Sequence, residues 1–186
     1  MQGIPILKFP GWRCRVERHD EAHFALPCFA RGDTVSILVA GLGSECGADA
    51  FGWEVLRALE SCGLPKTVNL MLCRHPGELM MPLLGADSAV IIDACVGGEK
   101  SGMLRRLRLE DIEGGERQLH GFGLVEVLRL VMALGVSPAR LQILGLTVAT
   151  PTTGLDPEWV SDGVRELVQI LSEPLPAAAL SSGKGC

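Results

Sequence analysis

The sequence predicts an α/β fold, a three-layer α/β/α sandwich with a mostly parallel sheet and one antiparallel edge strand. From residue 35 onward, short apolar runs alternate with longer segments in which apolar residues recur at helical spacing. Continuous apolar runs are typical of parallel strands covered on both faces, and their alternation with helices is typical of layered α/β domains. Residues 103–109 instead alternate between polar and apolar side chains, which favours a strand at the edge of the sheet.

The individual elements follow in order along the chain. Strands are predicted at residues 35–40, 68–72, 89–95, 103–109 and 141–148. Helices are predicted at residues 51–62, 78–84, 124–134 and 157–171. The first helix is expected to stop at Gly63-Leu64-Pro65, and Gly135 is expected to close the third, because glycine and proline interrupt helices. Asp156 is expected to cap the last helix, with Pro157 at its first position.

The sequence divides into three parts. Residues 35–172 form the predicted α/β domain, which is long enough to enclose a sizeable core. Residues 1–34 form an N-terminal extension that contains prolines and has no clean periodicity. Residues 173–186 are rich in Pro, Ala, Ser and Gly, and are expected to form a flexible tail.

Composition excludes several classes of protein. The formal net charge of −5 at pH 7 argues against a nucleic-acid binder, whose binding face is normally basic. No stretch approaches the roughly 20 apolar residues of a membrane-spanning helix, and no secretory signal is visible at the N-terminus. The seven cysteines form no recognisable disulfide framework, and Cys62, Cys73 and Cys95 are interpreted as buried thiols. We therefore expect a cytoplasmic protein that binds neither nucleic acid nor membranes, and we expect it to be a monomer.

Three segments with polar side chains are expected to meet at one edge of the sheet, because ligands of open α/β sheets bind at the carboxyl ends of the strands. The first strand leads into a glycine-rich segment, Gly41 to Gly47, and then into Asp49 near the start of a helix. Asp93 comes at the end of the third strand, and His120 precedes the third helix. Two carboxylates and an imidazole suit a divalent metal ion such as nickel or zinc.

Each of these residues also has a simpler interpretation. Asp49 could be the N-cap of a helix, and Asp93 could accept hydrogen bonds from the backbone at a strand end. His120 could be an ordinary histidine of a loop. The expected convergence of all three on one edge is what favours a joint site.

Two further patterns favour other sites less strongly. The segment Gly41-x-Gly43-x-x-x-Gly47 is similar to a dinucleotide-binding loop, but its third glycine comes one residue late and no acidic residue ends the second strand. Cys14, His19, His23 and Cys28 offer four candidate zinc ligands, at a spacing that matches no common zinc finger. A nucleotide-binding α/β enzyme is therefore the less favoured alternative.

Five segments resemble motifs of the hydrogenase maturation proteases. Gly41-x-Gly43-Ser44, followed by Gly47-Ala48-Asp49-Ala50-Phe51-Gly52-Trp53, resembles the glycine-rich opening of that family. Residues 90–94 resemble its second motif and residues 119–124 its histidine loop. Residues 76–79 and 154–158 resemble signatures of lesser weight. The resemblance extends from about residue 36 to residue 171.

This resemblance implies an aspartyl-type endopeptidase of nickel–iron hydrogenase maturation. Such an enzyme removes a C-terminal extension from the precursor of the large subunit, and nickel already bound in the precursor serves as the recognition element. The implied nickel ligands are Asp49, Asp93 and His120, and Asp49 is also the candidate catalytic residue. The implied substrate-binding residues are Gly41, Gly43, Ser44 and Gly47. Zinc or cadmium is expected to substitute for nickel in vitro.

Three segments depart from the family pattern. Ser44 replaces an asparagine, Ala48 replaces the first acid of an acidic pair, and Cys73-Arg74-His75 replaces the Asp-Gly-Gly turn of many members. The changes at Ser44 and Ala48 motivate an alternative function, that of a catalytically silent relative which binds the metallated partner as a checkpoint or chaperone. All three implied metal ligands are nonetheless present.

Overall fold

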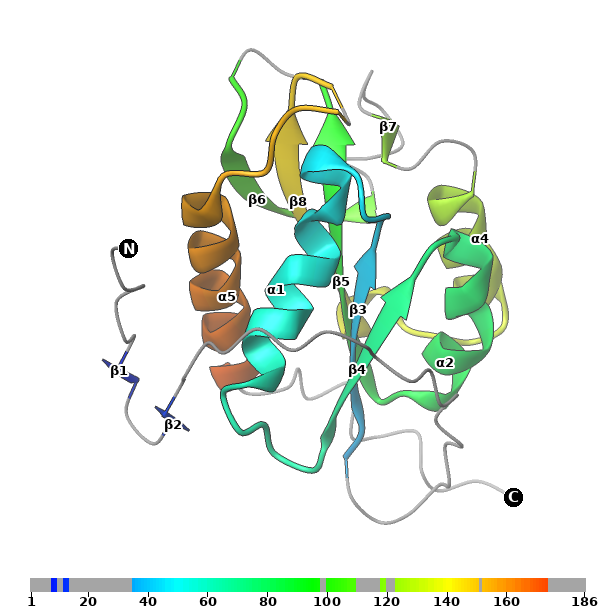
Figure 1. Cartoon of the computed structure of the whole chain (residues 1–186). Coiled ribbons are helices and arrows are strands. Elements are labelled where there is room, and N and C mark those ends of the chain that lie inside the picture. Colours follow the sequence, from blue (N-terminus) through cyan, green and yellow to red (C-terminus); the bar gives the residue numbers. More distant parts are fainter. Residues whose placement is uncertain are drawn as a thin grey trace, which may run out of the picture.

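The computed structural model describes residues 8–9, 12–13, 35–97, 100–109, 118–119, 123–150 and 152–173. Helices cover both faces of a central sheet, so the predicted α/β/α sandwich is confirmed (Figure 1). In the N-terminal extension, only the pairing of β1 (Lys8–Phe9) with β2 (Trp12–Arg13) is described. The rest of residues 1–34, the predicted tail after residue 173, His120 and the candidate zinc ligands Cys14, His19, His23 and Cys28 lie outside the described residues.

The main strands of the sheet follow the order β4-β3-β5-β8-β6. Their bounds are β3 Ile37–Leu42, β4 Val68–Cys73, β5 Ser88–Val96, β6 Met103–Leu107 and β8 Leu141–Val148. Neighbours from β4 to β8 run parallel, whereas β6 pairs antiparallel with β8 at the edge. The mostly parallel sheet with one antiparallel edge strand is thus confirmed. A short further strand, β7 (Gln118–Leu119), pairs antiparallel with the end of β5, and the sequence pattern does not predict it.

Two layers of helices bury the two faces of this sheet. The helices are α1 Phe51–Glu60, α2 Met80–Gly85, α4 Leu124–Ala133 and α5 Pro157–Ser172. Successive strand residues point to opposite faces, so Leu38 and Ala40 pack in the core beneath α2 and α4, while Val39 packs beneath α1 and α5. Figure 1 shows these two helix pairs on either side of the strands. Each face therefore has a core of its own.

Two strand boundaries differ from the prediction for local reasons. β3 begins two residues later than predicted, because its pairing with both neighbours starts at Ile37. It extends to Leu42, because Gly41 pairs with both neighbouring strands and Leu42 still pairs with Cys73. β6 ends at Leu107, two residues early, where its pairing with β8 ends.

Local sequence signals set the starts of two helical segments. The second helical segment starts earlier than predicted, with a 3-10 turn, η2 (Pro76–Leu79), because proline fits the first position of a helical turn. The backbone N–H of His75 donates to Glu78 Oε1 at 3.1 Å in front of this turn. The predicted cap of α5 is confirmed, since Asp156 Oδ1 accepts the N–H of Glu158 at 2.9 Å.

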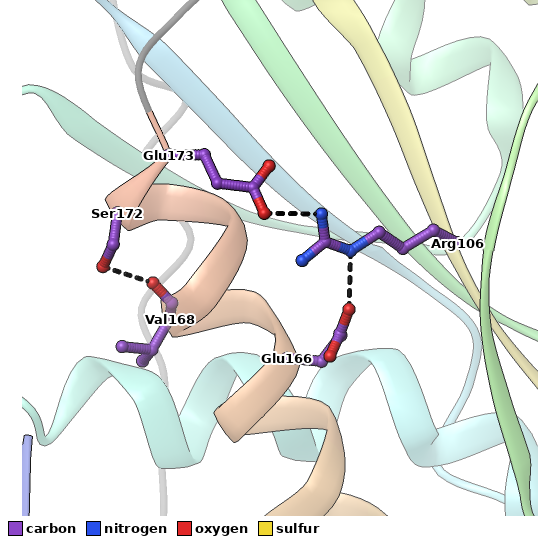
Figure 2. A network of polar contacts seen from close by, with 5 residues as sticks. All are labelled: Arg106, Glu166, Val168, Ser172 and Glu173. Carbon is purple, nitrogen blue, oxygen red and sulfur yellow. Dashed lines mark hydrogen bonds and ion pairs between the residues drawn. The ribbon is translucent and has the colours of Figure 1, made fainter.

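A cluster of ion pairs joins the antiparallel edge strand to α5 (Figure 2). Arg106 on β6 places its Nε 2.5 Å from Glu166 Oε1, and a terminal nitrogen 2.7 Å from Glu173 Oε1. The hydrogen bond to Glu173 is the main cause that raises the pKa of Arg106 above its ordinary value; Glu166 adds to this rise and burial opposes it. Arg106 therefore serves the packing of the fold, away from the site described below.

The cysteines follow the prediction only in part. Cys73 and Cys95 are buried thiols, as predicted. Cys62 is disulfide-bonded, so the prediction of a free thiol there is wrong. The free thiol was inferred from apolar surroundings, which suit a buried disulfide equally well. The cysteines therefore do not identify the cellular compartment.

One further property concerns membranes. Within the described part of the chain, no helix is both long enough and apolar enough to cross a bilayer.

Candidate active site

The glycine-rich segment after β3 makes a turn that only glycine fits. Gly43 has a φ of +146°, and a Cβ added there would lie 2.0 Å from the carbonyl oxygen of Asp49. Its backbone N–H donates to the carbonyl of Cys73, at the end of β4, over 3.1 Å. The chain then enters a 3-10 turn, η1 (Gly47–Ala50), which starts at Gly47 with a φ of +54°. The turn folds back over Asp49 because no side chain stands between them.

Asp49 lies in η1 and is partly buried. Its Oδ2 accepts a hydrogen bond from the hydroxyl of Ser44 at 2.5 Å. Because the acceptor is a carboxylate, this bond is of the stronger, charge-assisted kind, and it fixes the orientation of the side chain. The N-cap residue of α1 is Ala50 rather than Asp49, so the simpler interpretation of Asp49 as the helix cap is wrong.

Asp93 is a fully buried carboxylate within an apolar strand. It is 0% exposed and pairs in register with Gly145 of β8. Its Oδ1 accepts the backbone N–H of Ala94 at 2.8 Å. The interpretation that Asp93 accepts a hydrogen bond from the backbone is therefore correct, and it leaves open whether Asp93 also binds a metal. Burying a carboxylate costs free energy unless its surroundings compensate the charge. The burial of Asp93 therefore indicates that this side chain has a functional role.

Main-chain contact brings the segments that carry Asp49 and Asp93 together. A Cβ added to Gly52 in α1 would lie 2.7 Å from the carbonyl oxygens of both Leu42 and Ile92. The first turn of α1 therefore rests directly on the end of β3 and on Ile92 within β5, and η1 contacts β5. Asp49 precedes Gly52 by three residues and Asp93 follows Ile92 directly. The segments that carry the two carboxylates consequently meet at one corner of the sheet, where β3 ends.

The β7 strand closes this corner from the other direction. β3 pairs with β5 as far as Ile92, and β7 pairs with β5 at Cys95 and Val96. Because β8 occupies the other side of β5 throughout, β7 lies on the side that β3 has left. Asp93 thus falls between the end of β3 and β7. Leu119, which pairs with Cys95, is the residue before His120, so the chain leading to His120 runs beside the strand that carries Asp93.

The predicted three-ligand site is not tested by this geometry. Within the described ranges, no group of three His, Cys, Asp or Glu side chains is arranged to hold a metal ion. The predicted set requires His120, which lies outside those ranges. Asp49, Asp93 and His120 therefore stay a prediction as joint ligands, with two of the three at one corner.

The predicted substrate-binding residues take different positions. Gly41 is buried within β3, where a Cβ would lie 2.5 Å from Gly52 O, so its small size serves helix packing. Ser44 and Gly47 lie in the partly exposed segment beside Asp49. Ala48, in contrast, is fully buried in the core beneath α1 and α5. In this chain, an acidic side chain at position 48 would enter apolar surroundings at a considerable cost.

Two hydrogen bonds that hold the glycine-rich segment in place were not predicted from the sequence. The N–H of Ala48 donates to Thr153 O, in the loop after β8, at 2.6 Å. The indole N–H of Trp53 donates to the same Cys73 carbonyl that accepts from Gly43, at 3.1 Å. A tryptophan close behind the glycines was the only available signal for the second contact. Nothing in the sequence signals the hydrogen bond between Ala48 and Thr153.

Burial makes Cys73 itself chemically inert. Burial first, and the charge of Glu78 second, raise the pKa of its thiol from 9.0 to about 12. Since the thiolate is the reactive form of cysteine, Cys73 is not a nucleophile at neutral pH.

Comparison with known proteins now identifies the family. The family model described as hydrogenase maturation protease matches residues 54–173, which is more than half of the chain. The chain belongs to the hydrogenase maturation protease family. The resemblance inferred from the sequence motifs is thereby confirmed, as is the prediction of a peptidase. The matched range begins just after Asp49 and the glycine-rich segment, so it includes Asp93 and His120 but not the first carboxylate.

Solved structures agree with this family. The hydrogenase maturating endopeptidase HybD from E. coli is 25% identical, with a TM-score of 0.63 over 74% of this chain and 92% of that chain. The [NiFe] hydrogenase maturation protease HycI from Thermococcus kodakarensis KOD1 is 21% identical, with a TM-score of 0.58 over 75% of this chain and 91% of that one. The second likeness shows the fold alone. No curated protein sequence matches the chain.

Proposed function

We propose that this maturation protease is an endopeptidase that removes the C-terminal extension from the large-subunit precursor of a nickel–iron hydrogenase. Nickel already seated in the precursor is the recognition element, and Asp49, Asp93 and His120 are the residues that bind it. We further propose that the protein acts as a monomer in the cytoplasm, and that zinc or cadmium binds in place of nickel in vitro.

The observation that carries this proposal is the pair of carboxylates at one corner of the sheet. Asp93 is fully buried in an apolar strand, and Asp49 is held by Ser44 in the adjoining turn. Carboxylate oxygens and an imidazole nitrogen together suit a borderline divalent metal. The pairing of Leu119 with Cys95 supports the third ligand, because it brings the chain before His120 to the strand of Asp93.

The residues of the chain have separable roles in this reaction. Ser44 holds one oxygen of Asp49 and so presents that carboxylate in a single orientation. Gly43 and Gly47 place no side chain on the turn beside Asp49, which favours the close approach of a substrate peptide there. The bound metal of the substrate supplies a fixed point of attachment and a Lewis acid for the scissile carbonyl. Asp49 is the candidate base for the attacking water, since it lies nearest to the glycine-rich turn.

The decisive experiment incubates purified variants with nickel-loaded precursor. His120→Ala is expected to abolish cleavage without unfolding the domain, because two carboxylates alone hold the metal poorly. Asp93→Asn is expected to keep the fold and to weaken the affinity for nickel or cadmium in calorimetry, because it removes the charge while preserving the shape. Asp162→Asn is the matched control, since Asp162 is an exposed residue of α5 that pairs with Arg165.

The outcomes separate the alternatives. Circular dichroism establishes that each variant is folded. If a folded His120→Ala variant cleaved the precursor at the wild-type rate, the three-ligand site would be refuted. A wild-type protein that binds the metallated precursor but leaves its extension intact would instead support the catalytically silent checkpoint.

A further inference from the structure

Arg74 is an exposed cation on a rigid support. It directly follows β4, and its guanidinium carbon lies 5.6 Å from the centroid of the Trp53 ring. Trp53 is only 3% exposed, and its indole N–H is anchored on the Cys73 carbonyl. A cation over an aromatic face is attracted by the ring, so the stack restricts where the guanidinium lies.

The position of Arg74 is beside the candidate active site. The Cys73 carbonyl that precedes it accepts the N–H of Gly43, so Arg74 starts where the glycine-rich turn contacts β4. Two residues later, Pro76 lies against the start of α4: a Cβ added to Gly123 would be 3.5 Å from Pro76 Cγ. Arg74 therefore lies between the turn that carries Asp49 and the segment that follows His120.

Arg57 also lies over the Trp53 ring but differs from Arg74 in its ion pairing. Its guanidinium carbon is 5.8 Å from the Trp53 centroid, and it is also exposed. One of its terminal nitrogens lies 2.6 Å from Glu54 Oε1, so a neighbouring carboxylate already compensates its charge. In the part of the chain that the structure describes, no carboxylate forms an ion pair with Arg74.

We propose that Arg74 determines specificity by binding a carboxylate of the substrate's C-terminal extension. The carboxylate is either an acidic side chain of the extension or its terminal carboxyl group. A guanidinium presents paired donors that match the two oxygens of a carboxylate. Asp49 and Asp93 give this corner a negative charge that suits a metal ion and repels an acidic peptide, and Arg74 offsets that repulsion where the extension leaves the metal. This inference rests on the proposed function.

The test compares Arg74→Gln with Arg57→Gln on nickel-loaded precursor. Each variant removes one cation from the Trp53 ring, so the two share any loss of stacking. Arg74→Gln is expected to raise KM by roughly tenfold or more, the loss of one hydrogen bond between charged groups, with kcat nearly unchanged. Arg57→Gln is expected to leave both constants as in the wild type. Equal effects of the two variants, or no effect of Arg74→Gln, would overturn the proposal.

Two altered precursors identify the source of the carboxylate. In one, every Asp and Glu of the extension becomes Asn or Gln; in the other, a short neutral segment added at the end moves the terminal carboxyl group away. The altered precursor that brings wild type and Arg74→Gln to the same KM has lost the group that Arg74 binds. If neither does so, the proposal fails.

A failure of the proposed function would be recognised separately. In that case the wild type cuts none of the precursors. The affinities of the wild type and Arg74→Gln for the same intact precursor, measured by calorimetry, then decide the role of Arg74 without any cleavage. Equal affinities would refute it.

Discussion

Replacing Gly52 by alanine tests whether main-chain contact sets the geometry of the active-site corner. The added methyl group would lie 2.7 Å from two carbonyl oxygens, Leu42 O and Ile92 O, and 3.1 Å from the Cα of Gly41. These are backbone atoms of two paired strands, so none of them can rotate away as a side chain would. The shortest contacts fall about 0.7 Å below the 3.4 Å at which ordinary contact begins, so α1 must lift from the sheet.

The magnitude follows from two opposing effects. Overpacking of this kind costs typically 1–3 kcal/mol, and the rigid backbone places Gly52→Ala at about 3 kcal/mol. Alanine is the better helix former by about 1 kcal/mol, which offsets part of the cost. The net loss is therefore about 2 kcal/mol, or a melting temperature lower by roughly 4–8 °C for a domain of this size.

Urea denaturation followed by circular dichroism measures this loss. Gly77→Ala is the matched control, because Gly77 is exposed and no atom lies within 4 Å of an added Cβ. Its free energy of unfolding is expected to change by less than about 0.5 kcal/mol. Precursor cleavage by Gly52→Ala should fall further than the loss of folded protein explains, because the lifted helix displaces Asp49 from Asp93. A Gly52→Ala protein as stable as the wild type, as helix propensity alone predicts, would refute the argument.

Two further predictions concern groups outside the corner. Arg106→Gln should cost about 0.5–1 kcal/mol in urea denaturation at low salt and much less at 1 M salt, because the side chains of its pairs with Glu166 and Glu173 are 32–43% exposed and are therefore screened. A salt-independent loss would contradict this. For Cys73, the thiol pKa of about 12 in the folded protein lies above the value of 9.0 for an exposed thiol. The neutral thiol is thus favoured by folding, so its contribution to stability is complete below about pH 9 and is lost as the pH rises toward 12. Cys73→Ala should flatten that part of the stability profile, and an unchanged slope would show that the thiol ionises as readily in the folded state.

The fold was predictable because its central strands are continuous apolar runs between segments with helical spacing. Val39 and Ile91 lie in apolar runs that need cover on both faces, and the structure places helices there. Asp156 before a proline is a local signal that depends on no distant contact, and its cap is found as expected. The polar residues of β6 predicted a strand at the edge of the sheet, and β6 is found there, paired antiparallel with β8.

The parts that sequence reasoning missed depend on contacts between distant segments. The pairing of Leu119 with Cys95 leaves no periodic signal, because two residues are too few to show one. The burial of Ala48 and its contact with Thr153 O depend on a loop about a hundred residues away. The disulfide state of Cys62 could not be read from its apolar neighbours, which suit either redox form. The candidate ligands were identified by motif, whereas only the structure shows Ser44 as the hydrogen-bond partner of Asp49.

The placement of β7 has a consequence for how a peptide can approach. β5 pairs with β3 up to Ile92 and with β7 from Cys95, so only Asp93 and Ala94 separate the two partners on that side. A gap of two residues is too short for an incoming segment to pair as an added strand. We therefore expect the main chain of the substrate to run across the strand ends rather than along β5. Selectivity for the sequence of the extension would then come from side chains at the rim, such as Ser44 and Arg74, rather than from backbone pairing with β5.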